Sequence, residues 1–355
     1  MSVPGHWNEH NPLGESMAQT RILVTGAGGF IGHHLVTSLK SRGHWVRGVD
    51  MKAPEYSRTD ADEFVVGDLR DMGACMETTA GIDQVYALAA DMGGMGYISS
   101  HNAEILHSNA LINLNTVEAA RRNRVSRYLY TSSACIYPEF LQEETDVRPL
   151  REEDAYPAQP QDGYGWEKLV AELLCRYYRE DHGLETRIVR FHNIFGPLGT
   201  WEGGREKAPA AMCRKVAVAK HSGDRRVEIW GDGLQTRSFC HIDDCVEGLY
   251  RLMASDYSEP LNLGQDRLIS ISDLADLVAR IAGVEIEKVF VDGPQGVRGR
   301  NSDNTRLRDV LGWEPEISLE DGLTRTYAWI EQQVVARLAA GGDDEVVREE
   351  LIRAD

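Results

Sequence analysis

A tyrosine and a lysine four positions apart, Tyr164 and Lys168, form the pattern Y-x-x-x-K in this chain of 355 residues. On a helix, positions i and i+4 share one face, so the phenol and the ammonium would point into the same space. A nearby ammonium lowers the pKa of a phenol, which can then accept a proton near neutral pH. The apolar run that ends in Thr131, Ser132 and Ser133 adds hydroxyls that could hold a substrate alcohol. These residues predict proton transfer on an alcohol, although Y-x-x-x-K alone also arises by chance on surface helices.

A glycine-rich turn between a predicted strand and a predicted helix has the pattern G-x-x-G-x-x-G at Gly26, Gly29 and Gly32. Glycine permits the tight turn and lets the backbone approach a pyrophosphate, which the N–H groups of the helix N-terminus then bind. Alone this is a weak signal, because a plain strand–helix turn explains it. Asp50 strengthens it, since it ends the next strand, where a carboxylate accepts ribose hydroxyls and repels a 2′-phosphate. We therefore expect NAD rather than NADP, and its positive nicotinamide ring would lower the pKa of the Tyr164 phenol further.

Other residues join the predicted cofactor site. Asp68 ends the strand after Asp50 and could reach the adenine, although a role as a helix N-cap explains it equally well. The predicted cofactor-binding residues are Gly26, Gly29, Phe30, Ile31, Gly32, Asp50, Asp68, Tyr164 and Lys168.

The elements that must position these residues follow an alternating pattern. Short apolar runs alternate with amphipathic stretches from Arg21 onward, with long helices expected near 103–122 and 164–181. This alternation predicts an α/β fold with a parallel, doubly wound sheet. After Gly196 glycine and proline accumulate, which indicates a smaller, loop-rich C-terminal substrate domain. The predicted organisation is a flexible arm at 1–20, a cofactor domain at 21–191 with a return at 238–260, a substrate domain at 192–237 and 261–335, and an acidic tail at 336–355.

The composition restricts the partners. Asp and Glu total 56 against 38 Lys and Arg, which gives a net charge of −18. A surface this acidic repels phosphate backbones and anionic lipid, so we expect no nucleic-acid and no membrane partner. An anionic substrate would need a local cluster of cations. The six cysteines show no C-x-x-C spacing and the N-terminal residues lack an apolar signal segment, so we expect a cytoplasmic protein with reduced thiols.

Several long, unusual segments resemble one family. They are AADMGGMG, SSACIYPE, PQDGYGWEK, RFHNIFGPLGTWEGGREKAPAA, WGDGLQTRSF and GVRGRNSDN. From about residue 21 to 333 the chain resembles the extended short-chain dehydrogenases/reductases, and within their nucleotide-sugar branch the GDP-mannose 3,5-epimerases. The resemblance implies a Rossmann-type sheet and NAD-dependent epimerisation of GDP-D-mannose through a 4-keto intermediate. Inversion at C5 alone would give GDP-L-gulose, and inversion at C3 and C5 would give GDP-L-galactose.

The resemblance also assigns roles to individual residues. Tyr164, Lys168 and Ser133 would serve the oxidation, and Cys135 and Lys207 would form an acid–base pair on opposite faces of the sugar. The implied substrate-binding residues are Gly93, Ser133, Ala134, Cys135, Asn193, Glu206, Lys207, Ala208, Lys215, Gln235, Thr236, Arg237 and Arg300. The cations expected to neutralise the substrate are Arg205, Lys215, Arg237, Arg298 and Arg300. By analogy with relatives, pairing through the helices near 103–122 and 164–181 would give a homodimer.

Other interpretations stay open. A UDP- or dTDP-sugar 4-epimerase or 4,6-dehydratase would use the same scaffold, although the dehydratases carry Asp-Glu where this chain has Ala134-Cys135. A non-catalytic NAD-binding protein is the alternative outside the enzymes. Cys135 could be an inert buried thiol and Lys207 a solvated surface lysine. Cys240, His241, Asp243, Asp244 and Cys245 are metal-ligand types, but their spacing fits no zinc site, so we predict a helix start and no metal.

Overall fold

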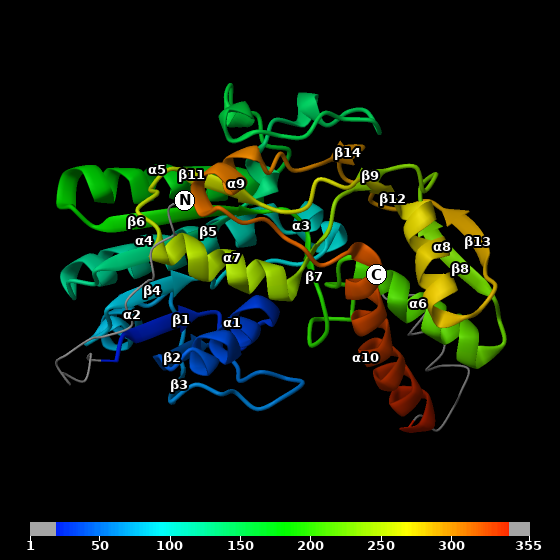
Figure 1. The fold of residues 1–355 in the computed structure, drawn as a ribbon, viewed down its shortest axis with the longest axis horizontal. Helices are drawn as coiled ribbons and strands as arrows, with labels where there is room; N and C mark the ends of the chain where they lie inside the picture. Colours follow the sequence, from blue (N-terminus) through cyan, green and yellow to red (C-terminus); the bar gives the residue numbers. More distant parts are fainter. Residues whose placement is uncertain (1–18, 341–355) are drawn as a thin grey trace, which may run out of the picture.

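A seven-stranded sheet forms the larger part of the molecule. Its strands are β1 (Arg21–Thr25), β2 (Trp45–Asp50), β3 (Glu63–Val66), β4 (Gln84–Ala87), β5 (Arg127–Ser133), β6 (Glu185–Phe191) and β11 (Pro260–Leu263). The computed structural model, which describes residues 19–340, pairs them all in parallel in the order β11-β6-β5-β4-β1-β2-β3 (Figure 1). Chain order reverses between β1 and β4, and ligands of such sheets bind at the carboxyl ends of the strands beside this point. The predicted Rossmann-type sheet is confirmed.

Helices cover both faces of this sheet. They are α1 (Phe30–Ser41), α2 (Met72–Thr79), α4 (Asn102–Arg122), α5 (Gly163–His182), α7 (Ile242–Ala254) and α9 (Thr305–Leu311). Within β1, Ile22 and Val24 join a core with α1, α7 and α9, whereas Leu23 joins a core with α2, α4 and α5. Side chains alternate across a strand, so β1 contributes to both hydrophobic layers.

The second part of the chain is smaller and has its own core. Its elements are α6 (Ala208–Ser222), α8 (Ile271–Ala282), α10 (Leu319–Ala340), β8 (Arg226–Trp230), β9 (Thr236–Arg237), β12 (Ile269–Ser270), β13 (Glu287–Val291) and β14 (Gly299–Arg300). Val216 of α6, Val278 of α8 and Ile330 of α10 are buried together in one cluster. This part lies beside the carboxyl ends of the sheet strands, on the right in Figure 1.

Short elements complete the part of the chain that the structure describes. They are α3 (Met95–Ser100), β7 (Ile194–Phe195), β10 (Cys240–His241) and the 3₁₀ turns η1 (Ala134–Ile136), η2 (Glu139–Leu141) and η3 (Glu152–Ala155). The two long predicted helices are confirmed within two residues as α4 and α5. Asp162 caps the N-terminus of α5 by accepting from the Gly165 N–H, and Gly183 ends the helix at φ +70°.

The boundaries of the two parts differ from those that we expected. α7 packs on the sheet, so the chain does return to the cofactor domain after residue 238, as predicted. However, the segment that belongs to this domain does not end at residue 260, because β11 pairs with β6 and Leu307 of α9 lies in the sheet core. The assignment of substrate binding to 192–237 and 261–335 stays a prediction. α10 extends to Ala340, so residues 336–340, which we assigned to the acidic tail, are helical. Residues 1–18 of the predicted arm and residues 341–355 of the predicted tail lie outside the described residues. In the described range, every helix is too short or too polar to cross a bilayer.

Candidate active site

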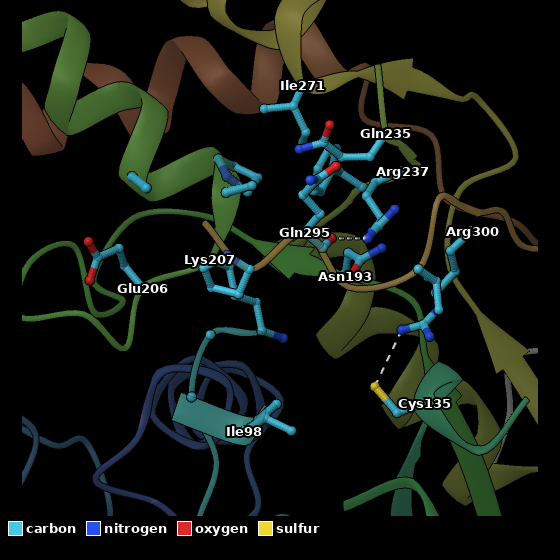
Figure 2. A pocket seen from close by; sticks show the side chains of 18 of the residues that line it. Ile98, Cys135, Asn193, Glu206, Lys207, Gln235, Arg237, Ile271, Gln295 and Arg300 are labelled. Carbon is cyan, nitrogen blue, oxygen red and sulfur yellow. Dashed lines mark hydrogen bonds between the residues drawn. The ribbon is translucent and has the colours of Figure 1, made fainter. Parts of the chain in front are cut away.

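A cavity lies where the carboxyl ends of β5 and β6 face the second part of the chain (Figure 2). It brings together nearly all of the predicted substrate residues. Those that line it are Gly93, Ser133, Ala134, Cys135, Asn193, Glu206, Lys207, Ala208, Lys215, Gln235, Arg237 and Arg300, and Tyr164 joins them. Thr236 is the exception, because its hydroxyl donates to the Thr145 carbonyl at 2.5 Å and it does not line the cavity.

Tyr164 and Lys168 occupy the first turns of α5, beside the end of β5. Both are buried, and the Lys168 ammonium donates to the Thr131 carbonyl at 3.0 Å and lies 5.6 Å from the centre of the Tyr164 ring. Gly165 makes this placement possible, since a Cβ there would lie 2.2 Å from the Cys135 carbonyl oxygen. The glycine therefore lets the N-terminus of the helix pack against the backbone of Cys135. The sequence alone did not identify this role of Gly165.

The electrostatics of Tyr164 differ from our expectation. Burial, with Cys135 and Glu167 nearby, raises the pKa of the Tyr164 phenol well above its ordinary value, and a hydrogen bond with Ser133 opposes this only in part. Burial also lowers the pKa of the Lys168 ammonium. The chain's own groups therefore do not produce the expected lowering of the phenol pKa; the positive charge of a bound nicotinamide ring would oppose the rise.

Cys135 and Lys207 enter the cavity from different elements. Cys135 lies in η1, directly after β5, and the Arg300 guanidinium donates to its Sγ at 3.3 Å (Figure 2). Lys207 is the N-cap of α6, and its side-chain nitrogen points into the same space. Burial lowers the pKa of the Lys207 ammonium, so a neutral amine forms more readily here than on a surface lysine. These positions fit two groups that act on one ring from different directions.

The cation cluster is smaller than predicted. Lys215, Arg237 and Arg300 line the cavity, but Arg205 lies outside it, 3.4 Å from Asp91 and stacked on the Tyr97 ring. Arg298 also lies outside, where it is paired with Asp232 at 2.9 Å. Both side chains pair with partly exposed carboxylates that do not line the cavity. The remaining three cations line the cavity, where they could meet an anionic ligand.

Two buried guanidinium groups that line the cavity, those of Arg237 and Arg214, differ in their partners. Arg237 donates to the carbonyls of Thr236 and Gln295 and not to a carboxylate, and burial together with Arg300 lowers its pKa to about 9. An anionic ligand would stabilise its charged form. Sequence reasoning missed Arg214, whose fully buried guanidinium binds the Glu206 carboxylate and the Trp201 carbonyl and so ties down the loop before Lys207.

The turn after β1 fits a dinucleotide. A Cβ at Gly28 would lie 2.0 Å from the Lys52 carbonyl oxygen, and one at Gly32 would lie 2.1 Å from that of Gly26. The Gly28 N–H donates to the Asp50 carboxylate at 3.0 Å, which places Asp50 beside the turn as expected. Gly28 stands at an unassigned position of the G-x-x-G-x-x-G pattern, so the sequence alone did not identify it. The backbone is thus open for a pyrophosphate at the N-terminus of α1.

The remaining predicted cofactor residues surround this turn. Ile31 links it to the cavity, which it lines. Phe30 packs edge-on against His34 at the start of α1. Asp68 is partly exposed and paired with Arg70 at 2.7 Å, and Asp71, not Asp68, caps α2. The N-cap interpretation of Asp68 is therefore wrong, and its contact with the adenine stays a prediction.

We predict that Gly28→Ala greatly reduces the NAD that copurifies with the protein, because the new methyl group must displace the Lys52 backbone beside Asp50. Gly96→Ala is the matched control, since Gly96 lies on α3 outside the turn and the nearest side-chain atom to its Cβ would be 3.9 Å away. The nucleotide released on denaturation would be identified and quantified. Wild-type protein should release NAD; predominant NADP would contradict the role of Asp50, and equal retention by both variants would contradict that of Gly28.

The segment from Cys240 to Cys245 forms the predicted helix start. His241 caps α7 by accepting from the Asp243 N–H at 3.3 Å, and Asp244 accepts from the Glu316 and Ile317 N–H groups. Among the residues that the structure describes, no group of three or more His, Cys, Asp or Glu side chains could hold a metal ion.

Comparison with known proteins agrees with this geometry. Residues 22–264 match the NAD dependent epimerase/dehydratase family. GDP-mannose 3,5-epimerase 1 of Oryza sativa subsp. japonica is 53% identical over 325 residues, which cover 91% of this chain and 85% of that protein. GDP-mannose 3,5-epimerase of Arabidopsis thaliana is 52% identical with the same coverage. The structure of UDP-glucose 4-epimerase from Thermotoga maritima, 26% identical, matches with a TM-score of 0.80 and covers 89% of this chain and 100% of its own.

Proposed function

Since the chain belongs to the NAD dependent epimerase/dehydratase family, and within it to the GDP-mannose 3,5-epimerases, we propose that it epimerises GDP-D-mannose. Inversion would occur at C5, or at C3 and C5, and would give GDP-L-gulose or GDP-L-galactose. The observation that carries the proposal is that Tyr164, Cys135 and Lys207 line one cavity at the carboxyl ends of the strands. That cavity also presents Lys215, Arg237 and Arg300, which suit the diphosphate.

The proposed mechanism solves a problem of acidity. The hydrogens on C3 and C5 of a hexose are not acidic until C4 becomes a carbonyl. Bound NAD would supply a hydride acceptor for C4 and, once reduced, a hydride donor to the same carbon. Tyr164 takes the C4 hydroxyl proton while Ser133 holds the oxygen, and both steps reverse at the end of the cycle.

Cys135 and Lys207 would carry out the proton transfers that invert the carbon. With C4 as a ketone, one of them removes the proton from C5, and the electron pair moves into an enolate oxygen at C4. The other donates a proton to the opposite face of C5, and the ketone forms again. C3 would react in the same way. Hydride and protons are all returned, so the reaction is a net isomerisation.

Two observations bear on the alternative substrates. The Thermotoga maritima UDP-glucose 4-epimerase and MoeE5, solved in complex with UDP-glucose and NAD, share the fold, but they are only 26% and 27% identical to this chain. The 3,5-epimerases are 52–53% identical. Cys135 and Lys207 have no task in a simple 4-epimerase, so their presence in the cavity favours inversion at carbons beside C4.

The deciding experiment is incubation with GDP-mannose in deuterated buffer, followed by NMR of the sugar nucleotides. We expect deuterium at C5 of the product and the appearance of GDP-L-gulose or GDP-L-galactose. UDP-glucose, offered in parallel, should give no C4 epimer. Rapid conversion of UDP-glucose with no reaction of GDP-mannose would establish the alternative, and bound NAD with no reaction of either would favour a non-catalytic protein.

We also propose a homodimer that pairs α4 and α5 with the same helices of a second copy. Large apolar side chains are exposed on these two packed helices, among them Leu106 and Leu114 of α4 and Trp166 and Val170 of α5. A twofold arrangement would cover them in a self-complementary interface.

Val170→Glu should therefore convert the dimer to a monomer in sedimentation equilibrium. Val335→Glu is the matched control, because Val335 is an exposed valine on α10, away from this face. A wild-type monomer, or a dimer that survives Val170→Glu, would contradict the proposed interface.

For the compartment, we propose the cytoplasm. The support is chemical, since all six cysteines are free thiols, as in proteins of reducing compartments.

A further inference from the structure

One buried glutamine contacts both chain segments that form the Arg300–Cys135 contact. Gln142 follows η2 and is only 1% exposed. Its side-chain amide donates to the carbonyls of Tyr137 and Pro138, each at 3.1 Å, in the turn that follows Cys135. Its backbone carbonyl accepts from the N–H groups of Arg298 and Gly299, at the start of β14. Gln142 thus joins the Cys135 segment of the larger part to the Arg300 strand of the smaller part.

The orientation of its amide is fixed by these contacts. Because the NH₂ group faces two carbonyl oxygens, the alternative orientation would place an acceptor against acceptors. The side-chain oxygen must therefore point the other way, where it accepts from Arg300 Nε at 2.6 Å. Nη1 of the same guanidinium then donates to Cys135 Sγ at 3.3 Å (Figure 2).

The guanidinium is planar, so fixing Nε also fixes the direction of both terminal nitrogens. A cation held against sulfur stabilises negative charge on it, which a thiol needs when it gives up a proton. A loosened guanidinium would lose that alignment, since the strength of a hydrogen bond falls steeply with its angle.

From these contacts we propose that Gln142 is a positioning residue, which holds the Arg300 guanidinium against Cys135 and thereby sustains the proton chemistry of that thiol. Its catalytic consequence rests on the proposed function, whereas its effect on thiol reactivity does not.

The test compares two single variants and their combination in the full-length protein. Gln142→Met removes every side-chain hydrogen bond of this residue, and Arg300→Met removes the guanidinium through which Gln142 is proposed to act. Alkylation by iodoacetamide at neutral pH reports on Cys135, because the other five cysteines are buried. Gln142→Met should slow this alkylation, and the exchange of the C5 proton of GDP-mannose, by about tenfold or more, the worth of a hydrogen bond to a charged group. In the Arg300→Met background the Gln142→Met change should add little to either loss, because the guanidinium that Gln142 positions is gone.

Gln265→Met is the control, since Gln265 is a half-buried glutamine that donates to the Pro315 carbonyl away from the cavity. It should leave both rates unchanged. Wild-type alkylation by Gln142→Met, or a loss in the double variant that equals the full product of the two single losses, would overturn the inference. Absence of C5 exchange in wild-type protein would instead count against the proposed function, and alkylation would still decide the role of Gln142.

Discussion

Tyr164→Phe should lower turnover of GDP-mannose by about 10²–10⁴-fold, the usual effect of removing a positioned general base. Phenylalanine keeps the buried ring beside Lys168 and removes only the hydroxyl that would take the C4 proton. Without the ketone at C4, the C5 proton stays non-acidic. Incorporation of solvent deuterium at C5 should therefore fall together with product formation, which NMR measures in one experiment.

Tyr86→Phe controls for the loss of a buried phenol. Tyr86 is 1% exposed in the sheet core that includes α1 and α7, and it does not line the cavity. It should turn over GDP-mannose like the wild type, and both variants should retain bound NAD. Normal C5 exchange by Tyr164→Phe would mean that another group makes the ketone, and the role given to Tyr164 would then have to be abandoned.

The fold followed from local pattern because the sheet is buried on both faces. Continuous apolar runs such as that of β1 and the long amphipathic helices α4 and α5 are signals that each segment carries by itself. The residue at which the chain leaves the sheet domain for the last time could not be predicted from such local signals. β11 has only four residues, and its pairing with β6 depends on a partner far away in the sequence.

The site was predictable as a set of lining residues and less so as a network. The resemblance placed Cys135, Lys207 and Arg300 correctly in one cavity, because long motifs report shared positions. The resemblance could not predict which arginine side chains form ion pairs with nearby carboxylates. Arg205 and Arg298 were therefore assigned to a cavity that they do not line.

Other features of the site could not be predicted because they depend on contacts between segments that are far apart in the sequence. The roles of Gly28 and Gly165 depend on backbone oxygens of Lys52 and Cys135 that come within 2.0 and 2.2 Å of a hypothetical Cβ. Gln142 belongs to none of the sequence motifs, and its proposed role follows only from its hydrogen bonds in the folded chain. The phenol of Tyr164 shows the same limit in electrostatics, since burial raises its pKa although the helical spacing brings an ammonium near it.

Cys135→Ala and Lys207→Ala should each separate oxidation from inversion. Tyr164, Lys168 and Ser133 remain in both variants, so C4 oxidation should continue and reduced cofactor should be detectable by its absorbance after mixing with GDP-mannose. Formation of GDP-L-gulose or GDP-L-galactose should fall by about 10²–10⁴-fold, because inversion needs both a base and an acid. Cys75→Ala, a buried thiol in the sheet core, and Lys40→Ala, a surface lysine paired with Asp62, are the controls.

The unreacted substrate then tells which residue removes the C5 proton. A variant that lacks only the returning acid still has its base, which takes the C5 proton, exchanges it with solvent and gives it back to the same face. Such a variant should accumulate deuterium at C5 of GDP-mannose without forming an epimer, whereas the variant that lacks the base should show neither label nor epimer. Normal product formation by Cys135→Ala or by Lys207→Ala would remove that residue from the mechanism.

The pH dependence gives an independent reading of Lys207. Burial lowers the pKa of its ammonium, so the neutral amine becomes abundant at lower pH than for an exposed lysine. If Lys207 removes the proton, inversion should accelerate as pH rises through this lowered pKa; if it returns the proton, inversion should slow over the same interval. Either dependence should disappear from the residual rate of Lys207→Ala. The sign of the slope in wild-type protein must then agree with the labelling result, since one lysine cannot begin the same inversion step as both base and acid.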